Sequence, residues 1–345
     1  MAYTTIDKSS DYFVTNLWTG NNTAQTITGI PFAPSFVWIK NRSTAESHTL
    51  VNTAVGANNF LKSNATSGNN TNSEFLKSFT SDGYTLGNAD EVNNGSNNIV
   101  GWNWKANGTG AANTAGSINT TKTSAETTSG CSIITYTGNG SSGATIGHGM
   151  GIKPSMILVK ETAGGNDWIV YTQALTANKI LYLNSTGAEN DNSVFFNDTE
   201  PTDSLITLGS IGATNGNGVA MVAYCFSNVQ GFSKQGSYLG NGSTDGTFVY
   251  TGFSPACVIM KCSSSGSTPW LIWDNKRPGY NVTNLRLRPN TTDAEDTSTA
   301  DPIDFLSNGF KCRGSNDDSN KSGSSFIYMA FAESPFVTST GIPAT

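Results

Sequence analysis

The sequence of 345 residues is poor in charged residues and in histidine. Asp, Glu, Lys and Arg together make up only 13% of the chain, and only two residues are histidine. The net charge of −6 excludes the basic surface that nucleic-acid binding requires. Two histidines leave little material for a zinc site or for general-base catalysis. We therefore expect neither a nucleic acid nor a metal as a partner.

Cysteine is scarce and shows no pairing pattern. The five cysteines are odd in number and none belongs to a Cys-x-x-Cys motif. Cys225 and Cys257 lie inside apolar runs, so we expect buried free thiols rather than disulfides. Such a chain is expected to fold in a reducing compartment, the cytoplasm of the cell that synthesises it.

Long apolar runs and heptad patterns are missing as well. No run approaches the ~20 apolar residues of a membrane-spanning helix, so membrane insertion is not expected. Residues 1–10 lack the basic and apolar segments of a secretory signal, and no heptads predict a coiled-coil shaft. Disorder is not expected either, because aromatic residues make up 10% of the chain and lie in apolar clusters.

One motif, a proline followed by an apolar run and a lysine, occurs three times. The copies are PSFVWIK, PSMILVK and PACVIMK. They begin at Pro34, Pro154 and Pro255 and end at Lys40, Lys160 and Lys261. A Gly-Asn pair precedes each proline, and an apolar run ending in an aromatic residue closes each copy. Because the order of these landmarks is kept, we predict a triplicated domain of about 100 residues.

Each copy has the pattern of short antiparallel strands. Short runs rich in Val, Ile, Thr, Tyr, Phe and Trp alternate with clusters of Gly, Asn, Ser and Asp. Asp82-Gly83 and Asn308-Gly309 are expected to be hairpin turns. The pattern predicts an all-β chain of three tandem antiparallel β-sandwich domains of jelly-roll-like type. The run after each proline should be a strand buried on both faces, with its lysine in solvent at the strand end.

The predicted domain limits follow these landmarks. Segment 105–129 has almost no large apolar residue, which predicts an extended low-complexity linker or arm. The chain is accordingly divided into an N-terminal segment (1–10), three sandwich repeats (11–104, 130–227 and 231–337), this linker, and a polar tail (338–345).

The sequence offers no clear catalytic or cofactor-binding motif. His48 stands where the other copies have Trp168 and Trp270, which indicates a packed residue, and His148 lies in a Gly-rich turn. Neither a Gly-x-Ser-x-Gly motif nor a phosphate-binding loop is present. Most carboxylates lie in turn-like segments, although distant carboxylates can still pair in a glycosidase. We therefore expect no enzyme and no cofactor, with segment 316–320 a weak candidate for calcium.

The best candidate for a binding surface lies in the third copy. Tyr280, in the segment NKRPGYNV, has no counterpart in the other copies. Lys276, Arg277 and Trp273 are close to it in the sequence. Loop aromatic residues can stack on sugars or on partner surfaces, so these four residues are candidates for surface binding. An ordinary solvated face or a contact between domains is the alternative for the basic residues.

Four longer blocks make the sequence recognisable. They are TYTGNGSSGATIGHGMGIKPSMILVK, SYLGNGSTDGTFVYTGFSPACVIMK, FIYMAFAESPFVTSTGIP and AYTTIDKSSDYF. In these blocks the chain resembles the repeated domains in virion proteins of marine tailed bacteriophages, which are loosely called tail-fibre proteins. The resemblance extends over essentially the whole chain and implies a phage structural protein, without catalytic residues to carry over.

The resemblance leads to one expected function and two alternatives. We expect a non-enzymatic protein on the virion surface, a tail fibre or appendage that attaches to the host. A capsid decoration (cement) protein is the first alternative, and a tail-associated polysaccharide-degrading enzyme is the second. The expected partners are other virion proteins and a host surface glycan. The chain could form a homotrimer, or its three copies could imitate one.

Overall fold

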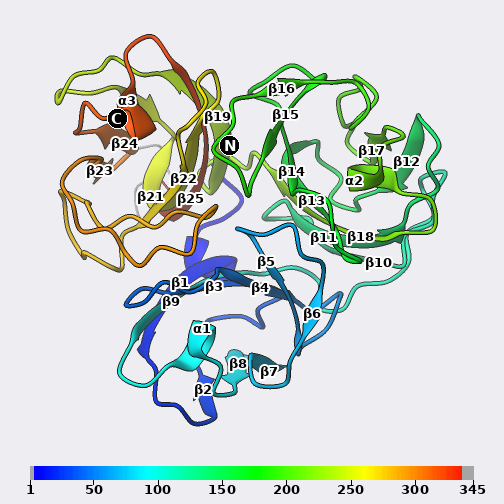
Figure 1. Cartoon of the computed structure of the whole chain (residues 1–345), viewed down its shortest axis with the longest axis horizontal. Helices are drawn as coiled ribbons and strands as arrows, with labels where there is room; N and C mark the ends of the chain where they lie inside the picture. The colour runs from blue at the N-terminus through cyan, green and yellow to red at the C-terminus, as the bar shows by residue number, and fades with distance from the viewer. Residues whose placement is uncertain (1–3, 336–345) are drawn as a thin grey trace.

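Short antiparallel strands account for nearly all regular structure in the computed structural model, which describes residues 4–335. The all-β prediction is thus confirmed. Figure 1 shows three lobes around a common centre, in the order of the sequence. No helix of residues 4–335 is long and apolar enough to cross a membrane. The predicted polar tail, 338–345, lies outside the described residues.

In each of the three large sheets the last strand of the repeat pairs on one side with an early strand and on the other side with a middle strand. The second sheet has one additional strand outside its early strand. The first sheet has the order β1 (Phe13–Thr19), β9 (Asn98–Trp104), β3 (Phe36–Asn41), β4 (Thr49–Asn52), β5 (Asn59–Lys62), β6 (Asn70–Thr71). The second has the order β10 (Lys122–Glu126), β11 (Cys131–Thr137), β18 (Ala220–Ser227), β13 (Pro154–Glu161), β14 (Ile169–Thr172), β15 (Lys179–Tyr182), β16 (Asn190–Asp191). The third has the order β19 (Ser233–Leu239), β25 (Ser325–Pro335), β21 (Phe253–Cys262), β22 (Trp270–Asp274).

A small sheet accompanies each large one. The small sheets are β2 (Gln25–Ile27), β8 (Gly83–Leu86) and β7 (Leu76–Thr80); β12 (Ala144–Gly147) and β17 (Leu205–Leu208); and β20 (Phe248–Tyr250), β24 (Gly309–Cys312) and β23 (Ile303–Leu306). A single helical turn precedes each last strand: α1 (Asp90–Asn93), α2 (Gly212–Asn215) and α3 (Asp317–Asn320). A 3-10 turn, Ser9–Asp11, precedes β1. We call each large sheet with its small sheet repeat 1, 2 or 3.

The central strands of each large sheet are buried on both faces of the sheet. One face packs against the small sheet of the same repeat, which gives three separate hydrophobic cores. The other face contributes to a fourth core, in which residues of all three repeats meet. The prediction of central strands buried on both faces is confirmed by β3 and β13, in which every residue is buried.

The closing aromatic residues of the three repeats meet in this central core. Trp104, Phe226 and Phe331 end the last strands of repeats 1, 2 and 3 or lie close to those ends. Their ring centroids are 5.9 Å apart for Trp104 and Phe226, 5.7 Å for Phe226 and Phe331, and 5.4 Å for Trp104 and Phe331. The rings are tilted or edge-on to one another, the arrangement that aromatic quadrupoles favour.

The prediction of an extended arm at 105–129 is wrong for its second half. Residues 122–126 form β10, which pairs with β11 along its whole length. This strand needs no large apolar residue because small hydroxyl groups are satisfied locally. Ser124 donates to the carbonyl oxygen of Gly108 at 2.7 Å, and the hydroxyls of Thr120 and Thr123 lie 2.8 Å apart.

The prediction that the motif lysines emerge into solvent is also wrong. Lys40, Lys160 and Lys261 are all fully buried. The strand end that would be free in an isolated sandwich faces the next repeat here, and backbone carbonyl groups replace water around each ammonium.

Candidate binding surface of the third repeat

The three buried lysines join neighbouring repeats in the same way. Each Nζ donates to oxygen atoms of its own repeat and to one carbonyl oxygen of a neighbouring repeat: Thr292 for Lys40 (3.2 Å), Thr66 for Lys160 (3.0 Å) and Thr186 for Lys261 (3.4 Å). Burial lowers the pKa of Lys40 and of Lys261 to about 8. Because all three seams contain this contact, it is explained by assembly of the fold rather than by a ligand.

The aromatic position after each lysine also belongs to the seams. Trp168 donates from Nε1 to the carbonyl oxygen of Lys62, and Trp270 to that of Tyr182, both at 2.9 Å. His48 is fully buried in repeat 1, and its Nδ1 accepts from Nε1 of Trp38 at 2.9 Å. Burial holds the pKa of His48 well below its ordinary value, so the ring is neutral. The expectation of a packed residue is confirmed.

His148 occupies a turn of repeat 2, as expected. Its ring is buried, with Nε2 lying 3.1 Å from the carbonyl oxygen of Thr202. The backbone N–H of Met150 donates to Nδ1 at 3.3 Å. Burial lowers the pKa of His148. Both ring nitrogens are therefore occupied by backbone contacts.

Segment 316–320 is used by the fold in a way that does not suit a calcium ion. Asn316 accepts from the N–H of Asp318 at 2.9 Å as the cap of α3. The buried Asn320 donates to the carbonyl oxygens of Ser243 and Gly314 at 2.8 and 2.9 Å. Within residues 4–335 no group of three or more His, Cys, Asp or Glu side chains is placed to hold a metal ion.

Repeat 3 departs from the other two at the loop that follows β22. The corresponding loops run over 53–58 in repeat 1 and 173–178 in repeat 2. In repeat 3 the chain continues from 275 to 286 before Leu287 pairs with Ile272. We call residues 275–286 the inserted loop. It contains Lys276, Arg277 and Tyr280, three of the four predicted contact residues.

A buried ionic cluster fixes the base of the inserted loop. Arg277 Nε lies 2.7 Å from Asp274, and Arg277 Nη1 lies 2.9 Å from Glu295. Glu295 also receives two hydrogen bonds from Arg42 of repeat 1, at 2.8 and 2.7 Å. Burial opposes ionisation of Glu295, but the hydrogen bond from Arg42 and the charge of Arg277 outweigh it and lower the Glu295 pKa. The loop is thereby attached to the neighbouring repeat.

The structure separates the four predicted contact residues. The side chains of Arg277 and Trp273 are fully buried, so the prediction that they form a surface is wrong. Two carboxylates satisfy Arg277, and Trp273 packs in the core of repeat 3. Lys276 is partly exposed and forms an ion pair with Glu333 at 2.8 Å. Tyr280 is 81% exposed, in agreement with its predicted place in a surface loop.

A second departure lies on the outer face of the small sheet. Repeats 1 and 2 place threonine pairs there, Thr26 opposite Thr85 and Thr145 opposite Thr207. In repeat 3 the residues that face each other are Phe248 and Lys311. Phe248 is 43% exposed, and the nearby Tyr250 is 50% exposed with Lys234 Nζ 5.6 Å from its ring centroid. The sequence patterns considered above do not single out Phe248 or Tyr250. An alignment of the three copies would reveal Phe248, because repeats 1 and 2 have threonine at that position.

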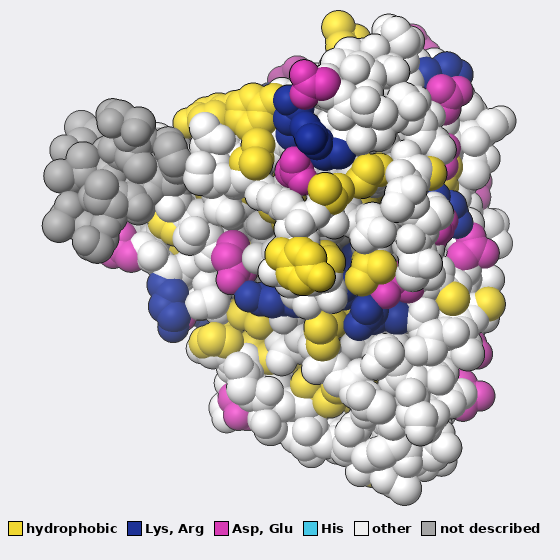
Figure 2. Space-filling model, turned by 90° about the vertical axis from the view of Figure 1, so that its left-hand side faces the viewer, with side chains coloured by type: hydrophobic (Ala, Val, Ile, Leu, Met, Phe, Trp, Pro, Cys, Tyr) yellow, Lys and Arg dark blue, Asp and Glu magenta, His cyan; other side chains and the backbone are white. Residues whose placement is uncertain are grey.

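We give the name third-repeat surface to five exposed residues of repeat 3: Leu239, Phe248, Tyr250, Tyr280 and Val282. These five are the exposed large hydrophobic residues of repeat 3, and Leu17 is the only other one in residues 4–335. Figure 2 shows hydrophobic side chains exposed between charged ones on the side of the molecule that includes repeat 3. Because nearly all exposed large hydrophobic residues among residues 4–335 lie in repeat 3, this repeat is the candidate for a contact surface.

Comparison with known protein families gives a match. Residues 8–335 match the model of a family described as a domain of unknown function, DUF7483. No curated protein and no solved structure matches the chain. The matched range includes all three repeats, from the turn before β1 to the end of β25. The chain therefore belongs to the DUF7483 family.

Proposed function

We propose that this protein is a non-enzymatic structural protein of a bacteriophage virion, exposed on the particle surface in a tail fibre or tail appendage. In this role it contacts the host surface, and other virion proteins hold it on the particle. The third-repeat surface is the observation that supports a contact function. The resemblance of four sequence blocks to phage virion proteins supports the setting.

The three repeats provide an internal comparison that strengthens this argument. They share the lysine seams, the central core and the sheet order, and these features account for folding. Exposed aromatic residues are not needed for that purpose, because repeats 1 and 2 have threonines on the same outer face. Phe248 and Tyr280 expose apolar area to water at a cost in solubility that a binding function explains.

The arrangement also bears on the expected homotrimer. Three similar sheets already enclose one core within a single chain, which is what three separate subunits achieve in a trimer. We propose that the chain acts as a single-chain imitation of a trimer, so that one of its three equivalent positions can differ from the others. A homotrimer of identical subunits would have to present the same surface three times.

The first test is the location of the protein on phage particles. Immunogold labelling of intact phage with an antibody against the chain should place gold on the tail. Gold spread over the head would support a capsid decoration protein instead. Release of reducing sugar from host polysaccharide by the purified protein would support a tail enzyme. Either result would replace the proposal.

The second test is binding of the purified chain to host cells. The variant Phe248→Thr, Tyr280→Ser gives repeat 3 the polar character of the other repeats and should lose most cell binding. Leu17→Thr is the matched control, because within residues 4–335 Leu17 is the exposed large hydrophobic residue that lies outside repeat 3, and it should be dispensable. Equal loss in both variants, or no cell binding by the unmodified protein, would contradict the proposed surface.

A further inference from the structure

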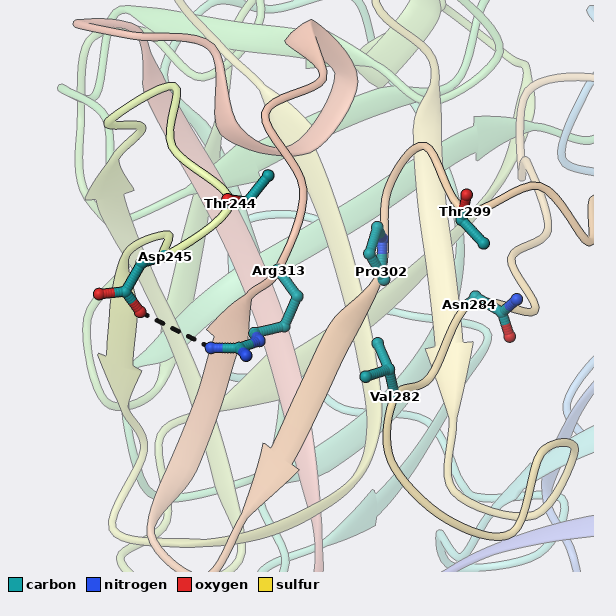
Figure 3. Close-up of a pocket in the computed structure, with 7 residues that line it drawn as sticks. All are labelled: Thr244, Asp245, Val282, Asn284, Thr299, Pro302 and Arg313. Carbon is teal, nitrogen blue, oxygen red and sulfur yellow. Dashed lines mark ion pairs between the residues drawn. The ribbon is translucent and has the colours of Figure 1, made fainter.

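Repeat 3 contains an open pocket with a volume of about 700 Å³, shown in Figure 3. Three segments that are distant in the sequence build it: the loop from β19 to β20, the inserted loop, and the chain on either side of the β23–β24 hairpin. The lining residues are Thr244, Asp245, Val282, Asn284, Thr299, Pro302 and Arg313. The volume suits one or two sugar rings or another small polar molecule.

The wall formed by the inserted loop is held in place by paired hydrogen bonds. Asn281 donates from Nδ2 to the carbonyl oxygen of Phe305 at 2.7 Å and accepts from the Phe305 N–H at 2.9 Å. Thr283 and Ile303 exchange two backbone hydrogen bonds of 2.8 and 2.9 Å. Val282 lies between these two anchors, and it is 47% exposed. An apolar side chain is thus fixed at the pocket before any ligand arrives, which lowers the entropy cost of binding.

The charges around the pocket are balanced. Arg313 lies 3.6 Å from Asp245 and 3.3 Å from Asp304, and Lys311 Nζ lies 2.6 Å from Asp245. Two positive groups therefore face two negative ones. A pocket without excess charge gives no electrostatic preference for a phosphate, a sulfate or a metal ion. It does offer donors and acceptors side by side, from Arg313, Asp245, Asn284 and two threonine hydroxyls.

We propose that this pocket binds a neutral sugar residue of a surface glycan. A sugar hydroxyl can donate to the Asp245 carboxylate and accept from the Arg313 guanidinium. The C–H face of the ring would pack on Val282 and Pro302, the two apolar lining residues. Tyr280 precedes Val282 by two residues and supplies an exposed ring on which a second sugar can stack. That the glycan belongs to a host cell rests on the proposed function.

The pocket depends on features that only repeat 3 has. The inserted loop provides Val282 and Asn284, and the corresponding loops of repeats 1 and 2, 53–58 and 173–178, are shorter. The same repeat holds Phe248 and Tyr250 on its small sheet. One position of a threefold scaffold has thus acquired both a pocket and an aromatic surface.

The test uses the purified full chain on an array of neutral oligosaccharides, with sialylated and sulfated oligosaccharides on the same array. Binding to at least one neutral oligosaccharide is expected. The single variants Arg313→Ala and Asn284→Ala should each weaken it at least about tenfold, because each removes hydrogen-bonding groups from the pocket. Lys77→Ala is the matched control, since Lys77 forms a similar surface ion pair, with Glu74, in repeat 1. Thermal unfolding of each variant verifies that the fold is kept.

The outcomes separate this inference from the proposed function. Binding only to acidic oligosaccharides would overturn the inference, and so would neutral binding that both variants leave unchanged. If the array shows no binding while the chain still attaches to host cells, the sugar pocket is overturned and the attachment function stands. If the array result holds but gold labelling places the protein on the capsid, the pocket stands and the attachment function falls.

Discussion

Lys160 in repeat 2 donates a hydrogen bond of 3.0 Å from Nζ to the carbonyl oxygen of Thr66 in repeat 1. Its counterparts make the equivalent contact at the other two seams. Oxygen acceptors surround each ammonium, but burial removes its hydration and lowers the pKa of all three lysines. The seams should therefore respond to alkaline conditions.

Lys40 provides the clearest test of this pH dependence. Its pKa falls from 10.5 to about 8 on folding, so between these values the unfolded chain holds a proton that the folded chain has released. Stability rises with pH wherever the unfolded state binds more protons. From pH 7.5 to 9.5 the Lys40 contribution should increase by about 2 kcal/mol. Urea unfolding of the unmodified protein and of Lys40→Met at both pH values measures it.

Buried thiols and phenols also titrate in alkaline solution, so the difference between the two proteins is the informative quantity. The free energy of unfolding of the unmodified protein, minus that of Lys40→Met, should increase with pH. Lys8→Met is the control, because the Lys8 side chain is 64% exposed and should give a constant difference. A constant difference for Lys40→Met as well would show that its burial does not govern seam stability.

Glu295 is the second position at which a seam can be tested. Glu295→Gln removes the carboxylate that Arg42 and Arg277 share, and leaves the buried Arg277 with one partner fewer. Breaking a buried ion pair from one side costs about 3 to 5 kcal/mol, which we expect at pH 7 in urea unfolding. Glu74→Gln removes an exposed ion pair with Lys77, which solvent screens, and should lower the free energy of unfolding far less.

The acid side of this prediction follows from the lowered pKa of Glu295. Its contribution is fully present above the ordinary pKa of 4.5 and is lost as the pH falls through the lower value of the folded state. The gap in stability between the unmodified protein and Glu295→Gln should therefore narrow in acid. If the difference in the free energy of unfolding stays constant down to the pH of acid unfolding, the charge of Glu295 does not contribute to stability and only the packing of its side chain does.

The sequence was sufficient to predict the strands and the landmarks of the repeats. Short β-branched and aromatic runs between turn residues are a local signal, and the closing residues Trp104, Phe226 and Phe331 were recognised as equivalent. Their meeting in one core could not be predicted, because nothing in a local pattern says which face of a sheet packs against another repeat. For the same reason, a local pattern predicts Lys40 in solvent, because it does not show that another repeat covers the strand end.

The candidate site was predictable only in part. Tyr280 stood out because no other copy has its loop, and a tyrosine between polar residues is readily exposed. Arg277 has the same polar neighbours but is buried. Its partner Glu295, and Arg42 which also pairs with Glu295, are distant in the sequence, so a local pattern does not reveal that the charge of Arg277 is satisfied inside the protein.

One turn was also predicted only approximately. The pattern assigns the glycine of Asp82-Gly83 to a turn, yet Gly83 is the first residue of β8, where a Cβ atom would collide with the carbonyl oxygen of Ile27.

A buried asparagine in each repeat should be more important for stability than its polar character suggests. Asn215 donates from Nδ2 to the carbonyl oxygens of Ser141 and Gly209 at 2.9 and 2.8 Å, and accepts from the N–H of Asn139 at 2.9 Å. Asn215→Ala leaves these three backbone groups without their partner, which should lower the free energy of unfolding by roughly 2 to 4 kcal/mol.

The neighbouring Asn217 supplies the control for this substitution. It is exposed two residues further along the chain, so Asn217→Ala should change stability by less than about 0.5 kcal/mol in the same urea titration. Asn93 and Asn320 make the equivalent contacts in repeats 1 and 3 and should give losses similar to that of Asn215. Equal effects of Asn215→Ala and Asn217→Ala would show that water replaces the missing amide.

Repeat 2 on its own should not be a monomer. In the full chain Leu158, Trp168, Tyr224 and Phe226 of this repeat are buried in the central core, against residues of repeats 1 and 3. A fragment of residues 105–228 would expose this face to water, and a patch of that kind drives association. Sedimentation velocity should show trimers or larger species of the fragment and a monomer of the full chain. A fragment that sediments as a monomer and unfolds cooperatively would show that the sandwich core alone determines the fold.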